Sequence, residues 1–95
     1  MQFKDGATLA IFDGANTSAA RRALPERLHE IARRKIDLIL SVSALADLAK
    51  PPSNHLEALK GKRKGQHSIR INDQYRVCFR WSIEGPSDIE ITDYH

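Results

Sequence analysis

The feature that most constrains the fold is a change in hydrophobic period close to Asn54. Before this residue, apolar side chains recur at the spacing of one helix face, and after it they alternate with polar ones, which is typical of half-buried strands. Helices followed by strands favour an α+β domain, in which N-terminal helices pack on one face of a C-terminal antiparallel sheet. The other face of the sheet is then left to polar side chains.

The helical half is dominated by one long pattern. It predicts a helix from about residue 18 or 24 to residue 42, with Pro25 in the first turn, where a missing backbone N–H costs nothing. The residues of its apolar face are Leu28, Ile31, Ala32, Ile36 and Ile39. A short helix is expected after Asp5 and another over residues 43–48, and Pro51-Pro52 ends the helical half.

The second half predicts four strands over residues 56–60, 66–71, 75–81 and 87–92. The stretches between them are short and rich in turn residues, so we expect an antiparallel meander. In the third strand, Val77, Phe79 and Trp81 share the face that meets the helices. The opposite, open face is lined by Arg70, Arg76 and Arg80, and it is the candidate site.

Length and composition limit the range of functions. A chain of 95 residues has room for a single domain, residues 1–95, with a thin core. The only cysteine, Cys78, indicates a reducing, cytoplasmic environment, and no Cys or His spacing calls for a metal or another cofactor. No signal peptide and no membrane-spanning run is predicted, so a membrane is not an expected partner.

The charge is unevenly distributed. The formal net charge is +3, yet residues 60–80 hold seven basic residues and one acid, Asp73, which gives +6 over 21 residues. Basic surfaces of this density suit a polyanion such as RNA, because neutralised phosphates release their counterions. An ordinary solvated basic face is the alternative. The candidate RNA-binding residues are Lys62, Arg63, Lys64, Arg70 and Arg80, with His67 and Tyr75 as flat surfaces for base stacking.

RNA cleavage without a metal requires one group to remove a proton from a 2′-hydroxyl, another to protonate the 5′-oxygen, and cations to stabilise the phosphorane. The C-terminal Asp93-Tyr94-His95 supplies an acceptor, a phenol and an imidazole directly after a predicted strand. The imidazole titrates close to neutral pH, which suits proton transfer. The alternative for His95 is a frayed terminal residue without a role.

Three further residues could contribute to this chemistry. Arg76 lies in the middle of a strand, where a guanidinium either pairs with a carboxylate or binds a phosphate. Glu57 is a candidate proton acceptor, and its alternative is a surface ion pair with a nearby arginine. Lys60 is a candidate phosphate ligand or an ordinary solvated turn lysine.

The C-terminal half closely resembles one known family. The matching residues are Leu56-Glu57-Ala58-Leu59-Lys60-Gly61, Arg63, Gly65, Ser68-Ile69, Asn72-Asp73-Gln74-Tyr75-Arg76 and the terminal Asp93-Tyr94-His95. These motifs resemble the HigB toxins, also called plasmid maintenance system killer proteins, of the RelE superfamily. The resemblance runs from about Phe3 to the end and is looser in the helical half.

The resemblance implies a compact RelE-like fold, ribosome-dependent cleavage of translated mRNA on the 70S ribosome, and neutralisation by a HigA-like helix-turn-helix antitoxin. It implies His95 as the leading acid or base, Tyr94 as a positioning group beside Asp93, and Lys60 and Arg76 as stabilisers of phosphate charge. The sequence departs from the pattern at three positions. Glu57 stands where some members have His, Lys62 where Asp is common and Tyr75 where Trp is common. Glu57 therefore either replaces the histidine as proton acceptor or leaves that role vacant.

Three other functions are compatible with parts of the pattern. A gyrase-directed toxin of the same superfamily shares the architecture but lacks the Asp-Tyr-His ending. A catalytically silent RNA-binding or regulatory module would keep the basic sheet and be indifferent to loss of His95. A standalone secreted-type ribonuclease would combine paired histidines with disulfides, which this chain does not offer. The ending favours the ribosome-dependent nuclease.

Overall fold

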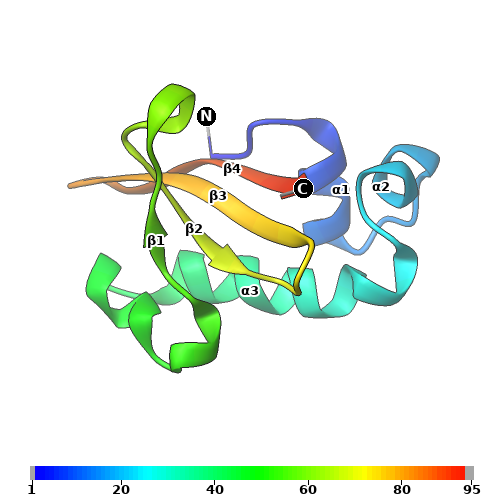
Figure 1. Ribbon diagram of the computed structural model, residues 1–95. Helices are drawn as coiled ribbons and strands as arrows, with labels where there is room; N and C mark the ends of the chain where they lie inside the picture. Colours follow the sequence, from blue (N-terminus) through cyan, green and yellow to red (C-terminus); the bar gives the residue numbers. More distant parts are fainter. Residues whose placement is uncertain (1, 94–95) are drawn as a thin grey trace.

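The computed structural model describes residues 2–93. Figure 1 shows the helices gathered against one side of a sheet that the second half of the chain builds, so the α+β prediction is confirmed. The elements, with η for short 3-10 helices, are α1 (Gly6–Asp13), α2 (Ser18–Ala23), η1 (Glu26–Leu28), α3 (His29–Ser41), η2 (Leu45–Ala49), η3 (Pro52–Asn54), β1 (Glu57–Ala58), η4 (Gly61–Arg63), β2 (Gln66–Arg70), β3 (Tyr75–Ser82) and β4 (Gly85–Asp93).

Helix α1 is the short helix expected after Asp5. The Asp5 carboxylate accepts a hydrogen bond from the backbone N–H of Thr8 at 2.7 Å and so caps the first turn. The helix ends at Gly14, which adopts a left-handed conformation with φ 77° that glycine enters at no steric cost. Ile11 is the fully buried apolar residue of this helix.

The long helix predicted up to residue 42 is in fact interrupted. Thr17 caps α2, which ends at Ala23, and Leu24 is extended with φ −156° and ψ 134°. The proline ring disfavours helical geometry in the preceding residue, so Leu24 leaves the helix. Pro25 stands at the N-cap of η1, and the prediction that it lies in the first turn of the long helix is wrong. Of the predicted apolar face, Ala32, Ile36 and Ile39 are buried on one side of α3.

The sheet is an antiparallel meander of four strands in the order β1-β2-β3-β4, as predicted. Strand β1 is shorter than expected. After Ala58, the N–H of Leu59 still bonds to the carbonyl of Gln66 at 2.9 Å, and then Gly61, with φ 63°, turns the chain into η4. Strand β4 is longer than expected and starts at Gly85, which pairs with Ser82 across a tight turn.

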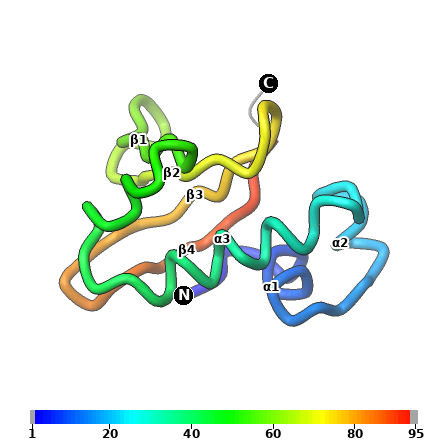
Figure 2. The backbone as a smooth tube through the Cα atoms, turned by 90° about the horizontal axis from the view of Figure 1, so that it is seen from below, coloured from blue at the N-terminus to red at the C-terminus, as the bar shows by residue number. Residues whose placement is uncertain are grey.

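The core lies between α1, α3 and one face of the sheet. Figure 2 shows α3 running along the sheet and α1 lying beside its β4 side. The principal buried apolar residues are Ile69, Val77, Phe79, Ile89 and Ile91 from the strands and Ile11, Leu24, Ala32, Ile36 and Ile39 from the helical half. Val77 and Phe79 meet the helices as predicted, and Trp81 packs against the same core while partly exposed.

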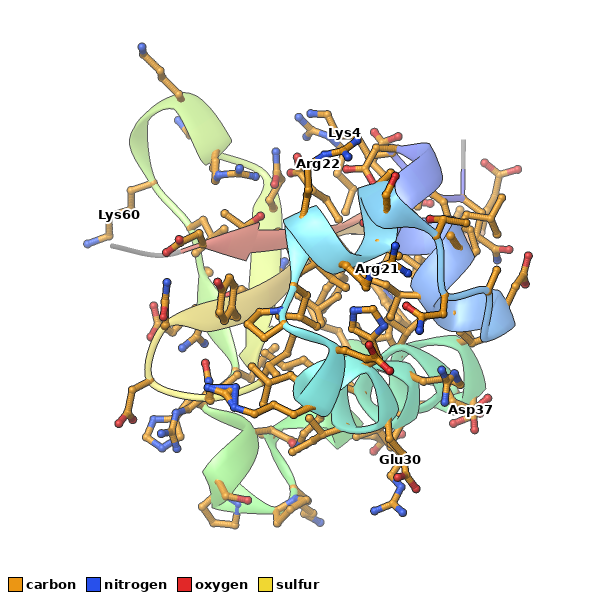
Figure 3. The ribbon with its side chains drawn as sticks, turned by 90° about the vertical axis from the view of Figure 1, so that its right-hand side faces the viewer. Lys4, Arg21, Arg22, Glu30, Asp37 and Lys60 are labelled. Carbon is orange, nitrogen blue, oxygen red and sulfur yellow. The ribbon has the colours of Figure 1, made fainter. Side chains whose placement is uncertain are left out.

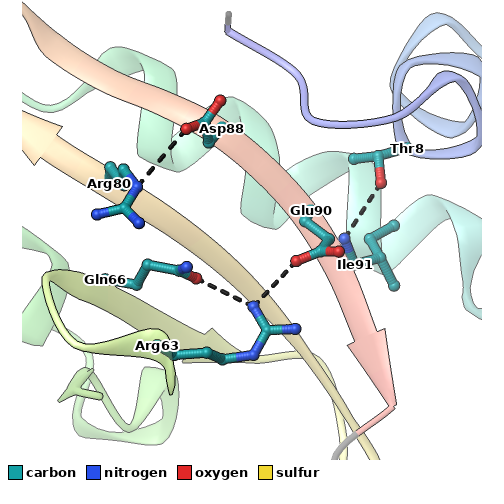
Figure 4. Close-up of polar contacts among 7 residues, drawn as sticks. All are labelled: Thr8, Arg63, Gln66, Arg80, Asp88, Glu90 and Ile91. Carbon is teal, nitrogen blue, oxygen red and sulfur yellow. Dashed lines mark hydrogen bonds and ion pairs between the residues drawn. The ribbon is translucent and has the colours of Figure 1, made fainter. Parts of the chain in front are cut away.

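The outer edge of β4 is covered by the beginning of the chain. Phe3 forms a parallel bridge with Ile89, whose N–H bonds to the carbonyl of Gln2 at 2.8 Å. Farther along, the N–H of Ile91 donates to the hydroxyl of Thr8 at 3.1 Å (Figure 4). These contacts satisfy donors that an open edge strand would expose, and they hold β4 between α1 and β3.

Candidate nucleic-acid interface

Strand alternation places polar and charged side chains on the face of the sheet turned away from the helices. The pairing sets Ser68 opposite Cys78, Cys78 opposite Glu90, and Arg70 opposite Arg76. We call this surface the polar face, made of Gln66, Ser68, Arg70, Arg76, Cys78, Arg80, Glu90 and Thr92. The arginines that the sequence analysis assigned to the open side of the sheet all lie on it.

Arg76 is held at the centre of the polar face. It is only 9% exposed, its Nε donates to Ser68 Oγ at 2.7 Å, and its Nη2 donates to the backbone carbonyl of His55. Nη2 also lies 3.7 Å from Oε1 of Glu57. Of the two interpretations of Glu57, the structure therefore gives the ion pair with an arginine, and the guanidinium is fixed in one orientation.

Arg63 is turned back onto the polar face and does not point into solvent. Its Nη1 donates to Gln66 Oε1 and to Glu90 Oε1, each at 3.0 Å (Figure 4). The side chain thereby reaches from η4 to β4 and ties the β1–β2 connection to the far side of the sheet. Sequence reasoning missed Glu90, because alternation assigns it to a face but not to a partner 27 residues away.

A bulge in β4 brings another acid to this surface. Cys78 pairs with Glu90 but Arg80 pairs with Ser87, so β4 has one residue more than β3 between these pairs. Asp88 in the bulge has φ 50°, and its carboxylate lies 3.6 Å from Arg80 Nε (Figure 4). A Cβ at Gly65 would come within 3.1 Å of the Arg80 guanidinium, so the glycine permits this close approach.

The polar face is therefore less cationic than its sequence suggests. Residues 60–80 contain the single acid Asp73, which pairs with Arg70. Folding adds carboxylates from β1 and β4, so each of the arginines 63, 70, 76 and 80 lies beside an acid. These acids are distant in sequence, and a local charge count does not include them.

The lysines of the β1–β2 connection behave differently from the arginines. Lys60, Lys62 and Lys64 are exposed, and within residues 2–93 none of their ammonium groups has an ion-pair or hydrogen-bond partner. Figure 3 shows Lys60 extending away from the body of the molecule. We call Lys60, Lys62 and Lys64 the lysine loop. It presents solvated positive charge at the border of the polar face, which suits phosphate contacts.

Cys78 is fully buried and lies within electrostatic reach of Arg63 and Arg76. Burial raises the pKa of its thiol, while the nearby Thr92 hydroxyl and the charges of Arg63 and Arg76 oppose that shift. The thiol is therefore protonated and unreactive, as expected of a structural cysteine.

His67 and Tyr75 do not join the polar face. His67 pairs with Phe79 across β2 and β3, and their rings stack with centroids 6.3 Å apart. Tyr75 packs against the edge of the core. Both side chains therefore lie on the side of the sheet that the helices cover, and the structure does not bring them together with Arg76 as a platform for bases.

Asp93 ends β4 at the register position opposite Tyr75. It is exposed, and its Oδ2 accepts a hydrogen bond from Gln74 Nε2 at 3.0 Å. The neighbouring β3 residue Arg76 pairs with Thr92, so Asp93 lies one residue along β4 from the position opposite Arg76. Tyr94 and His95, the other candidates of the C-terminal motif, lie outside the described residues.

No three His, Cys, Asp or Glu side chains among residues 2–93 gather closely enough to hold a metal ion. Nor does any helix there have the length and apolarity needed to cross a membrane.

Comparison with known proteins places the chain in a family. The model of the RelE-like toxin HigB of type II toxin-antitoxin systems matches residues 1–95. Toxin HigB-1 of Vibrio cholerae is 40% identical over 60 residues, 63% of this chain and 63% of the relative. An uncharacterized protein of Haemophilus influenzae is 40% identical over 58 residues, 61% of this chain and 57% of that relative. The matches thus span less than two thirds of the length of either relative. The predicted resemblance is confirmed, and this chain belongs to the HigB family of RelE-like toxins from type II toxin-antitoxin systems.

Proposed function

We propose that this chain is a metal-independent endoribonuclease that cleaves translated mRNA on the 70S ribosome and so stops protein synthesis. We also propose that residues 1–95 act as one toxin domain, in the cytoplasm, and that a HigA-like helix-turn-helix antitoxin binds and silences it. Membership of a type II toxin family supports the antitoxin partner, because these toxins occur with a neutralising protein. The name of the Vibrio cholerae relative, Toxin HigB-1, supports the toxic role.

The observation that carries this proposal is the fixed guanidinium of Arg76 on the polar face, a face that the lysine loop borders. Arg76 is oriented by Ser68 and His55 before any RNA arrives, so it needs no reorganisation to face developing negative charge. The exposed lysines lie in the connection that follows β1, the strand that carries Glu57. Solvated lysines can attract the RNA backbone, while the preorganised arginine can stabilise a reacting phosphate.

The reaction we propose is attack of a 2′-oxygen on the adjacent phosphorus, with loss of the 5′-oxygen. The 2′-hydroxyl gives its proton to a base, the new P–O bond closes a cyclic phosphate, and an acid protonates the departing 5′-oxygen. His95 is the proposed acid or base and Tyr94 a positioning group beside Asp93. Lys60 and Arg76 stabilise the charge on the phosphorane.

Glu57 has a place in this scheme that its ion pair defines. The carboxylate is 54% exposed, so RNA can reach it, while Arg76 holds it at the centre of the site. It is our candidate for the proton acceptor at the position where some family members have histidine.

The direct test uses purified chain, ribosomes programmed with a defined mRNA, and primer extension to map cuts. We expect cuts within translated codons, and no cuts in the same mRNA without ribosomes. A supercoiling assay with gyrase is run in parallel. Inhibition of gyrase without RNA cuts would replace the nuclease with a gyrase-directed toxin, and tight RNA binding without cuts would replace it with a silent RNA-binding module.

A further inference from the structure

A buried amide lies one residue before His55, whose carbonyl accepts a hydrogen bond from Arg76. Asn54, the last residue of η3, is 0% exposed, and both ends of its side-chain amide are used. Oδ1 accepts a hydrogen bond from Lys35 Nζ at 2.5 Å. Nδ2 donates to the carbonyls of Leu48 and Lys50, each at 3.2 Å. Asn54 therefore joins α3, η2 and the chain that leads into β1.

The next residue connects this amide to Arg76. His55 is in the left-handed region with φ 47°, a conformation that costs a non-glycine residue free energy and persists only where neighbouring contacts impose it. Those contacts lie on both sides. Asn54 is anchored on one side, and on the other the carbonyl of His55 accepts a hydrogen bond from Arg76 Nη2. Glu57, the ion-pair partner of Arg76, follows two residues later.

Lys35 supplies the contact from the helical layer. It lies on α3, and burial lowers the pKa of its ammonium group, with Arg70 adding to the effect. Partial burial of an ammonium group is costly unless it is hydrogen-bonded, and Asn54 provides that bond. The chain thus maintains a polar connection between α3 and the loop in front of β1, where an apolar contact would suffice for packing alone.

We propose that Asn54, held by Lys35, is a positioning residue for the Arg76–Glu57 site. This inference rests on the proposed nuclease function. It adds two residues, Asn54 and Lys35, that lie outside the family motifs named above. The hydrogen bonds of the Asn54 amide fix the position of the next residue, His55. The carbonyl of His55 in turn fixes the orientation of the Arg76 guanidinium. Loss of the amide lets the guanidinium move within the site, although no group that touches RNA is removed.

This role predicts a loss of turnover rather than of binding. The lysine loop is untouched by a change at residue 54, so the KM for programmed ribosomes should stay within about twofold. Displacement of the charge-stabilising group should lower kcat by about tenfold or more, because catalysis is sensitive to small shifts of reacting groups. A residue with only a structural role would lower the folded fraction and leave the kcat of the folded enzyme unchanged.

The test compares Asn54→Ala and Lys35→Met with two matched controls, Asn16→Ala and Lys50→Met. Asn16 hydrogen-bonds Arg21 on the surface, and the Lys50 side chain is exposed in the same loop. Turnover is measured per folded molecule. We expect Asn54→Ala and Lys35→Met to lower kcat at a nearly unchanged KM, and the two controls to keep the native kcat. An unchanged kcat in Asn54→Ala and Lys35→Met, or an equal loss in the controls, overturns the proposal.

A second measurement needs no activity. Hydrogen exchange at Arg76 Nε–H, read by ¹⁵N NMR, reports whether the guanidinium keeps its bond to Ser68. We expect exchange to speed up in Asn54→Ala and Lys35→Met and to stay at the native rate in the two controls. Equal rates in all five proteins overturn the positioning role. If the native chain makes no ribosome-dependent cuts, the proposed function fails, and the exchange rates still decide the positioning claim.

Discussion

Nη2 of Arg76 and Oε1 of Glu57 lie 3.7 Å apart, with the arginine buried and the carboxylate 54% exposed. The pair therefore has one member fixed by the protein and one that meets solvent. Arg76 also donates hydrogen bonds to Ser68 and to the carbonyl of His55, both groups of the protein. Arg76 therefore gives the site its fixed orientation, while Glu57 is the member that RNA can reach. Substitution of the two residues should change the stability of the fold by different amounts.

Glu57→Gln should have a small effect on stability. The substitution keeps the shape of the side chain, and an ion pair with one exposed member contributes at most about 1 kcal/mol. Arg76→Ala should cost about 2 kcal/mol, because it strands the buried hydroxyl of Ser68 and a backbone carbonyl. Urea unfolding of both variants measures the difference. A larger loss for Glu57→Gln than for Arg76→Ala would contradict the assignment of Arg76 as the anchored member.

The bridge from Arg63 to Glu90 should behave as a brace for the loop. Both side chains are partly buried, and a charge-assisted hydrogen bond in such a setting contributes about 1 kcal/mol after allowance for solvent screening. We expect Glu90→Gln and Arg63→Met each to lower the free energy of unfolding, and the double variant to lose less than the sum. Strictly additive losses in the double-mutant cycle would show that the two residues act independently.

The lysine loop should dominate the salt dependence of RNA binding. The logarithm of the RNA affinity falls with the logarithm of the salt concentration, and each phosphate contact with single-stranded RNA adds about 0.7 to the steepness of that fall. The double variant Lys62→Gln, Lys64→Gln should therefore make the slope less steep by about 1.4. Lys50→Gln, an exposed lysine outside the loop, is the control. RNA affinity measured across a salt series decides the matter. The same slope for the native chain and the double variant would place the RNA elsewhere on the molecule.

Cys78 should make stability depend on alkaline pH. Burial raises the pKa of its thiol in the folded chain, so the neutral thiol stabilises the fold below the unfolded pKa of about 8.5. That stabilisation is lost as the pH rises through the folded pKa, because only the unfolded chain ionises freely. We expect the stability of the native chain relative to Cys78→Ala, measured by urea unfolding, to be constant at neutral pH and to fall as the pH rises above about 8.5. A difference independent of pH would mean that the thiol is solvated in the folded chain.

The division of the chain into helices and strands could be predicted because hydrophobic period is a local property. The break at Leu24 also had a local cause, the following Pro25, and attention to the residue before the proline would have found it. Alternation alone also places His67 with Ile69 and Tyr75 with Val77, away from Arg76. The chemistry of these two rings suits base stacking, but their odd-numbered positions in the strands place them on the face opposite to Arg76.

The partners of the arginines could not be predicted from sequence. Arg63 meets Glu90, and Lys35 meets Asn54, across separations of 27 and 19 residues that only the folded register defines. The bulge at Asp88 adds a further shift that alternation does not encode. The placement of Arg70, Arg76 and Arg80 on one face of the sheet was thus predicted correctly, while the acids that pair with these arginines emerged from the structure.

The central claim is that the toxin cuts mRNA during translation and uses Arg76 with the C-terminal motif to do so. The most direct measurement is growth arrest with primer-extension mapping of mRNA after induction, comparing the native chain with Arg76→Lys, Arg76→Ala and His95→Gln at equal levels of folded protein. The account predicts cuts within translated codons for the native chain and their loss in Arg76→Ala and His95→Gln, with Arg76→Lys retaining a fraction. Growth arrest without cuts by the native chain, or unchanged cuts in Arg76→Ala and His95→Gln, would contradict it.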